Sequence, residues 1–126
     1  MLTYRARCHC GQVRFTFRSE AITSGCRCNC SLCVRRGAVM SPAYLPPEGF
    51  DDVQGWDALT LYQFGEKSLR HYFCASCGIS PFSVVASIPD DYVGTAKPGY
   101  YRVNLGCVDD LDVGALALTL IDGRSY

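Results

Sequence analysis

The sequence has no excess of either charge and no long apolar run. Its 126 residues hold 12 Lys and Arg against 12 Asp and Glu. A neutral domain lacks the broad cationic field on which general nucleic-acid binding depends. No stretch approaches the roughly 20 apolar residues of a membrane-spanning helix, and we find no internal repeat, linker or low-complexity segment. These absences predict one domain over residues 1–126, outside the membrane and without a nucleic-acid partner.

The start of the chain also lacks a secretory signal. The segment MLTYRARCHCG has neither the apolar stretch nor the small-residue cleavage site of such a signal. We therefore expect a cytoplasmic protein, whose thiols stay reduced. The nine cysteines are odd in number, and most fall into groups with gaps of one or two residues. In a reducing compartment this pattern indicates metal binding or catalysis rather than a disulfide framework.

Apolar and polar residues alternate with a period of two along much of the chain, as in strands with one buried face. Segments rich in aromatic and β-branched residues lie between Gly, Pro or Ser, which also favours strands. Only residues 112–120 could form a helix, with Asp112 as its cap. We predict an all-β, mainly antiparallel domain. Its expected strands are 13–18, 59–64, 69–73, 82–88 and 101–105.

Two cysteine pairs near the beginning and the middle of the chain predict a structural zinc site. Cys8 and Cys10 precede Gly11 and the first clear strand, and Cys74 and Cys77 lie in FCASCG. Together they supply four sulfurs, the full ligand set of a closed tetrahedral zinc site. An ion held there would join two hairpins, and its binding free energy would be folding free energy.

The third group, CRCNCSLC, leaves two possibilities open. It offers four thiols, Cys26, Cys28, Cys30 and Cys33. If all four bind one ion, the centre is saturated and inert, whereas three thiolates leave zinc an exchangeable position. Alternation along an extended segment does not exclude Cys26, because residues 26, 28 and 30 would point to the same side.

Basic residues accumulate around this third group. Residues 1–36 hold seven arginines and one acid, and Arg27, Arg35 and Arg36 lie within a few residues of the cysteines. One interpretation is a set of solvated strand faces balanced by acidic neighbours. The other is that these arginines gather an anionic ligand over the metal, and Arg35 or Arg36 could bind a carboxylate by a bidentate pair.

Four segments resemble the glutathione-dependent formaldehyde-activating enzyme family, which includes the centromere protein V-like proteins: CNCSLCVRRG, HYFCASCGISPF, YRVNLGCVD and IDGRSY. The likeness covers nearly the whole chain. It implies that the outer pairs hold a structural zinc and that Cys28, Cys30 and Cys33 hold a catalytic zinc. Cys26 falls outside the family pattern, and Asn29 stands where the family usually has histidine. The implied fold is β-tent-like, a zinc-pinned, folded pair of sheets similar to that of a small Rab-interacting exchange factor.

The activity implied by the resemblance is that of a carbon-sulfur lyase, or synthase, which joins glutathione and formaldehyde into S-(hydroxymethyl)glutathione. The ligands suit that chemistry. Three thiolates make zinc a poor generator of hydroxide, but a thiol arriving from a substrate would lose its proton and remain a good nucleophile. Cys28, Cys30 and Cys33 are thus the predicted catalytic residues, and Arg35 and Arg36 the predicted glutathione-binding residues.

Two other functions stay open on the sequence. One is a zinc-stabilised binding or scaffold protein without catalysis, because a fold does not fix a function. The other is a redox or metal-storage protein, in which Cys26 could oxidise onto a cysteine of the third group. His9, His71 and Cys107 are expected to have structural or surface roles, since the other cysteines already complete the ligand sets.

Overall fold

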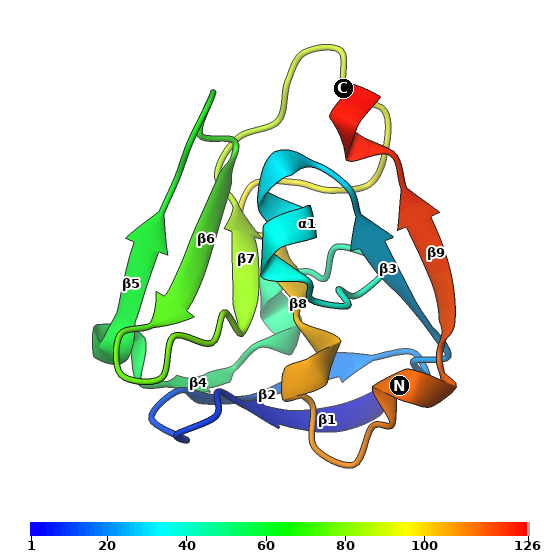
Figure 1. Ribbon diagram of the computed structural model, residues 1–126. Helices are drawn as coiled ribbons and strands as arrows, with labels where there is room; N and C mark the ends of the chain where they lie inside the picture. Colours follow the sequence, from blue (N-terminus) through cyan, green and yellow to red (C-terminus); the bar gives the residue numbers. More distant parts are fainter. Residues whose placement is uncertain (126) are drawn as a thin grey trace.

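The computed structural model describes residues 1–125, and its strands form three sheets (Figure 1). Two sheets are antiparallel, with strand orders β1-β2-β4 and β5-β6-β7-β8, and the third is a parallel pair of β3 and β9. The predicted all-β, mainly antiparallel fold is therefore confirmed. The strands are β1 (Leu2–Arg7), β2 (Arg14–Ser19), β3 (Ser24–Cys28), β4 (Asp52–Gln54), β5 (Leu59–Tyr62), β6 (Leu69–Cys74), β7 (Phe82–Val85), β8 (Tyr101–Val103) and β9 (Ala117–Ile121).

The helix α1 (Ser31–Arg36) occupies the space between the sheets. In Figure 1 the sheet of β5, β6 and β7 stands on one side of α1 and the β3–β9 pair on the other, while β1, β2 and β4 lie beneath. Short 3-10 turns complete the fold at Pro47–Gly49, Trp56–Ala58, Leu105–Cys107, Val113–Ala115 and Gly123–Ser125. None of the helices within residues 1–125 has the length and apolar character needed to cross a membrane.

An aromatic core joins the two antiparallel sheets. In β2, Phe15 and Phe17 are buried while the arginines at either end of the strand are exposed, as the alternation predicts. Phe50 stacks on Phe17 and on Tyr101 of β8, with ring centroids 5.4 and 4.0 Å apart. Phe82 meets Phe15 edge-on at 5.2 Å. These ring contacts fix the angle between the two antiparallel sheets. They therefore also fix the distance between the pair Cys8 and Cys10, which follows β1, and the pair Cys74 and Cys77 at the end of β6.

All five predicted strands are present. The bounds of β2 and β6 lie within one residue of those expected, whereas β5, β7 and β8 end two or three residues early. The C-terminal part of the chain differs from the prediction. The strand expected over 101–105 stops at Val103, because the Asn104 side chain accepts a hydrogen bond from the N–H of Gly106 at 3.0 Å and starts a 3-10 turn. The helix expected over 112–120 is wrong. Asp112 caps only the turn Val113–Ala115, after which the chain extends into β9 and pairs with β3.

Helix α1 was not predicted, because its N-terminal cap is a cysteine instead of the usual Ser, Thr, Asp or Asn. The Cys30 Sγ accepts a hydrogen bond from the N–H of Cys33 at 3.4 Å. At the other end Gly37 adopts a left-handed conformation with φ of 69° and donates its N–H to the carbonyl of Cys33 at 2.9 Å. The Arg-Arg-Gly sequence at residues 35–37 was the available signal for this helix end.

Candidate metal centres

The outer cluster, Cys8, Cys10, Cys74 and Cys77, has the geometry of a closed metal site. Its four sulfurs lie within 4.8 Å of one another, and the Sγ of Cys10 is 3.7 Å from those of Cys8 and Cys74. Tetrahedral zinc with bonds of about 2.3 Å places its sulfurs about 3.8 Å apart. The two 3.7 Å spacings match that distance, and the 4.8 Å limit brings the other sulfurs within reach of the same ion.

Two tight turns position these sulfurs. Gly11 has φ of 82° and its N–H reaches the carbonyl of Cys8 at 3.3 Å, while Gly78 has φ of 80° and its N–H reaches the carbonyl of Cys74 at 2.8 Å. The Cys8 Sγ also accepts the N–H of Val13 at 3.4 Å. Because one turn lies between β1 and β2 and the other between β6 and β7, the outer cluster lies between two hairpins, one in the first sheet and one in the largest.

The middle cluster, Cys28, Cys30 and Cys33, also brings its sulfurs within 4.8 Å of one another. Cys28 ends β3, Cys30 caps α1 and Cys33 lies in the first turn of the helix. The N–H of Cys30 donates to the Cys28 Sγ at 3.4 Å. All three side chains are half-buried. Because the cluster offers three sulfurs where tetrahedral zinc takes four ligands, it leaves one position for a further ligand.

Cys26 is not a member of the middle cluster. Among the described residues, the thiols close enough to share one ion there are those of Cys28, Cys30 and Cys33 alone. The Cys26 side chain is buried, and its backbone pairs with Thr119 of β9 and with Met40. The geometry thus supports the three-thiol alternative that the sequence left open.

The thiols of the middle cluster have perturbed pKa values that bear on its charge. Burial, aided by the hydrogen bond with Cys30, raises the pKa of Cys33 to about 12, although the nearby Arg36 lowers it in part. Burial also raises the pKa of Cys30, but hydrogen bonds from the Cys33 and Leu32 backbone and from neighbouring thiols outweigh it, so the net pKa is lowered. Three thiolates this close together repel one another, and a bound cation would offset that repulsion.

The C-terminal segment lies directly against the middle cluster. A Cβ added to Gly123 would be 2.4 Å from the Cys28 Sγ and 3.1 Å from the Cys30 Cβ. Only glycine allows the chain to pass this close. The signal for this residue was the terminal IDGRSY motif, but nothing in the sequence showed where the motif would lie.

Asn29 holds that segment in place. Its amide nitrogen donates to Asp122 Oδ1 at 2.9 Å, and its amide oxygen accepts the N–H of Arg124 at 3.0 Å. Its own N–H donates to the carbonyl of Ile121 at 3.1 Å. Hydrogen bonds from Ser125 and Asn29 lower the pKa of Asp122. Asn29 therefore has a structural role here that sequence analysis missed, since its partners are about 93 residues away in the chain.

Arg35 and Arg36 point in different directions. Arg36 donates toward the Cys33 Sγ at 3.6 Å and toward Ser83 Oγ at 3.4 Å, and its Nε is buried without a partner among the described residues. Arg35 is exposed and donates to the carbonyl of Ser31 at 2.8 Å. Arg36 therefore belongs to the interior side of the cluster and Arg35 to its solvent side.

His71 lies behind Arg36 as a neutral, buried group. Its Nδ1 is 2.9 Å from Ser83 Oγ, and burial together with the charge of Arg36 lowers its pKa to about 4. His9 is exposed between Cys8 and Cys10. Cys107 is buried, and burial raises its pKa to about 12. None of these three belongs to a cluster that could hold a metal within the described residues, in line with the structural or surface roles expected for them.

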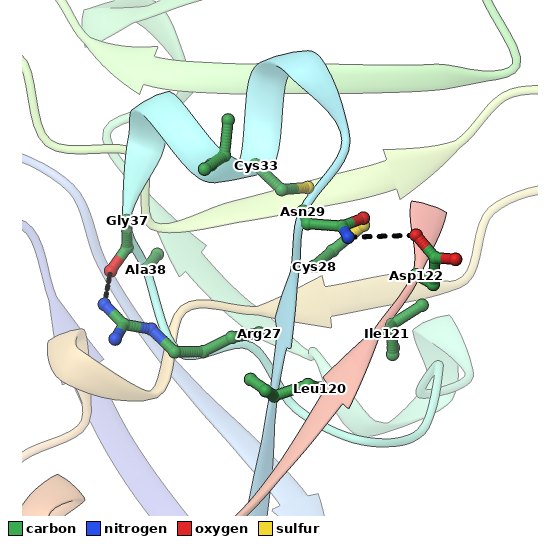
Figure 2. A pocket seen from close by; sticks show the side chains of 10 residues that line it. Arg27, Cys28, Asn29, Cys33, Gly37, Ala38, Leu120, Ile121 and Asp122 are labelled. Atoms are coloured by element: carbon green, nitrogen blue, oxygen red, sulfur yellow. Dashed lines mark hydrogen bonds between the residues drawn. The ribbon is translucent and has the colours of Figure 1, made fainter. Parts of the chain in front are cut away.

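Two grooves flank the middle cluster. The apolar groove, seen in Figure 2, contains Cys28 and Cys33 and is walled by Val34, Ala38, Leu120 and Ile121, with Arg27 and Asp122 at its rim. The basic groove lies beside Cys30 and is lined by Ser31, Arg35, Phe64 and Arg124. Asn29 and Val34 border both grooves. The cluster is thus accessible from two chemically different sides.

Comparison with known proteins places this geometry in context. A family model described as glutathione-dependent formaldehyde-activating enzyme matches residues 3–117, which include all seven cysteines of the two clusters. The chain is also similar to a Rhodobacter sphaeroides protein of known crystal structure, a structural genomics target. The two share 32% sequence identity and a TM-score of 0.70, and the match covers 91% of this chain and 99% of the other.

Proposed function

This chain belongs to the glutathione-dependent formaldehyde-activating enzyme family, and from that membership we propose that it adds a small thiol to an aldehyde at the middle cluster. Glutathione and formaldehyde are the proposed substrates and S-(hydroxymethyl)glutathione is the product. In this addition the thiol sulfur bonds to the carbonyl carbon, and the thiol proton ends on the carbonyl oxygen. The reverse reaction cleaves the carbon-sulfur bond, so the enzyme is proposed to be a carbon-sulfur lyase, acting in the cytoplasm.

Zinc is the proposed cofactor of both clusters, with a structural role at the outer one and a catalytic role at the middle one. The sulfur spacing fits tetrahedral zinc in the outer cluster. In the middle cluster three cysteine sulfurs lie within 4.8 Å of one another, a donor set that suits zinc. Zinc bound there supplies one chemical effect, which is to favour the thiolate form of a further thiol that coordinates it.

The residues around the middle cluster are proposed to hold its sulfurs in one arrangement. Arg36 donates toward Cys33 from the interior, and the backbone N–H groups of Cys30 and Cys33 donate to the preceding sulfurs of the cluster. These donors stabilise negative charge on the sulfurs and fix their positions. Gly123 keeps the C-terminal segment from displacing Cys28.

The basic groove is the proposed binding site for the carboxylates of glutathione. Arg35 and Arg124 both line it, and each guanidinium carries five N–H donors in a fork that matches a carboxylate. Arg35 uses one of its nitrogens on Ser31, which leaves the others free for a ligand. Arg36 is also a predicted glutathione-binding residue, and this role stays a prediction. The contacts of Arg36 with Cys33 and Ser83 favour a role at the cluster itself.

The single observation that carries the proposal is the middle cluster itself, three half-buried thiols within 4.8 Å and no fourth thiol beside them in the described residues. The test is metal analysis together with NMR detection of S-(hydroxymethyl)glutathione formation. We expect two zinc equivalents in the wild type, one in Cys30→Ser, and loss of activity in that variant. Cys26→Ala is the matched control, because Cys26 lies on β3 two residues before Cys28 but outside the cluster, and it should keep both ions and the activity.

The same experiment separates the enzyme from a zinc-stabilised scaffold. A scaffold would bind zinc in the outer cluster and accelerate no reaction between glutathione and formaldehyde. Equal reaction rates with wild-type protein and with Cys30→Ser would remove the middle cluster from the mechanism.

A further inference from the structure

The apolar groove is larger than formaldehyde requires. Formaldehyde has two non-hydrogen atoms, whereas the groove encloses about 370 Å³, which is within the usual range for small-molecule sites. Cys28 and Cys33 of the middle cluster are among its lining residues, so a molecule lying in the groove would be next to a thiol held at that cluster. The groove is therefore continuous with the proposed reaction site.

Apolar side chains from distant parts of the chain converge on this groove. Val34 on α1 is 58% exposed and Leu120 on β9 is 80% exposed. Single exposed apolar residues are common and need no explanation. Here, however, both line one hollow beside the middle cluster, and both remain available to a ligand because neither packs into the core.

Most polar groups of the groove hydrogen-bond to the protein, and the rest of the Arg27 guanidinium lies at its rim. Arg27 donates to the carbonyl of Gly37 at 2.9 Å, and Asp122 accepts hydrogen bonds from Asn29 at 2.9 Å and from Ser125 at 2.6 Å (Figure 2 shows the first two). The surface left for a ligand is therefore mainly apolar, that of Val34, Ala38, Leu120 and Ile121, with the remaining nitrogens of Arg27 at one edge. The basic groove differs, since it presents Arg35 and Arg124 to a charged substrate.

We propose, on the basis of the proposed function, that besides formaldehyde the enzyme accepts aldehydes with an apolar substituent of several carbons, which lies in the apolar groove against Val34 and Leu120. The thiol enters from the basic groove and the aldehyde from the apolar one. The thiol sulfur bonds to the aldehyde carbon, the carbonyl π bond is lost, and the thiol proton ends on the resulting hydroxyl. No oxidant or reductant is consumed.

The experiment measures enzymatic acceleration for a series of straight-chain aldehydes from formaldehyde to pentanal, each with glutathione. Each rate is divided by the uncatalysed rate for the same aldehyde, which removes differences in intrinsic reactivity. Each methylene that leaves water strengthens binding by up to about fourfold. We expect the acceleration to rise along the series.

Two variants locate the effect. Leu120→Ser should lower the ratio of pentanal to formaldehyde acceleration by about fivefold or more, because Leu120 lines the groove. Leu118→Ser is the matched control, since Leu118 is also an exposed leucine of β9 but lies outside the groove, and the ratio should stay at the wild-type value.

The outcomes separate the two proposals. If formaldehyde is accelerated but acceleration does not rise with chain length, this inference is wrong and the proposed function stands. If no aldehyde is accelerated, the proposed function fails and the inference fails with it. If Leu120→Ser leaves the ratio unchanged but alters self-association in sedimentation, the groove is an interface between copies of the chain and the inference is again wrong.

Discussion

Replacing Gly123 with alanine should damage the middle cluster by a purely steric route. The added Cβ would lie 2.4 Å from the Cys28 Sγ, whereas ordinary contacts between carbon atoms lie at about 3.5–4.0 Å and sulfur is larger still. The sulfur or the segment must therefore move by about 1 Å. Gly123 has no left-handed backbone conformation, so the substitution introduces no strain from φ.

The size of the effect follows from two estimates. Metal sites tolerate ligand displacements of about 0.2 Å, so a shift of about 1 Å would break the arrangement of the three sulfurs. Overpacking of this kind costs about 1–3 kcal/mol, which corresponds to a loss of about 5- to 150-fold in affinity. Competition with a chromophoric zinc chelator measures this loss directly. Gly123→Ala should release one of its two zinc ions at a lower chelator concentration than the wild type does.

Gly114→Ala is the matched control for this variant. Gly114 also has an ordinary φ, and the nearest atom to its added Cβ is 3.3 Å away on the Asp112 side chain. It lies outside both clusters, so both zinc affinities should stay at the wild-type values. In addition, Asn29→Ala should release the C-terminal segment and reduce the effect of Gly123→Ala in the double variant. Wild-type zinc affinity in Gly123→Ala itself would refute the account of the close approach.

Three further predictions concern stability and substrate binding. Removing zinc from the outer cluster, by chelation or by Cys74→Ser, should unfold the protein, because structural zinc contributes about 10–16 kcal/mol while whole domains are stable by about 5–15 kcal/mol. His71 has a pKa of about 4 in the folded state against an ordinary 6.5. As the pH falls, this histidine therefore becomes protonated in the unfolded chain before it does in the folded protein. The resulting stability is present above pH 6.5 and is lost as the pH falls toward 4, by up to about 3 kcal/mol. His71→Gln should flatten this part of a denaturation series. Replacing Arg35 and Arg124 with glutamine should each weaken the binding free energy of glutathione by about 1–2 kcal/mol. Titration calorimetry measures this loss.

Each of these predictions has an outcome that would contradict it. Native near-ultraviolet circular dichroism after loss of the outer zinc would show that the cluster does not support folding. Equal pH dependence of unfolding in wild type and His71→Gln would exclude His71 as the titrating group. Arg5 is an exposed arginine outside the basic groove. If Arg5→Gln weakens glutathione binding as much as the other two substitutions do, the effect comes from the net charge of the protein and not from the groove.

The cysteine clusters could be predicted from the sequence because their spacing is local. Cys28, Cys30 and Cys33 lie within six residues, so a turn and a helix start are enough to bring their sulfurs together. The outer pairs are separated by a long stretch, but each pair is a tight turn with a glycine beside it. Strand alternation alone could not decide whether Cys26 belongs to the middle cluster, because it does not fix where the strand ends and the helix begins.

The C-terminal residues beside the middle cluster could not be predicted, because their position depends on the pairing of β9 with β3. That pairing carries Leu120 and Gly123 to the cluster. The sequence at 112–120 favoured a helix by local composition, and tertiary pairing overrode this preference. The exposed leucines on β9 had no local signal that distinguished a groove wall from an ordinary surface.

The central claim is that the middle cluster captures the thiol of the substrate, and cadmium-113 NMR tests it most directly. Cadmium in both clusters should give two resonances, one for the outer and one for the middle cluster, assigned with Cys30→Ser. Glutathione should move only the resonance of the middle cluster, and S-methylglutathione, which has no free thiol, should move neither. If glutathione forms its adduct with formaldehyde on the protein while both resonances stay in place, the account of the middle cluster is wrong.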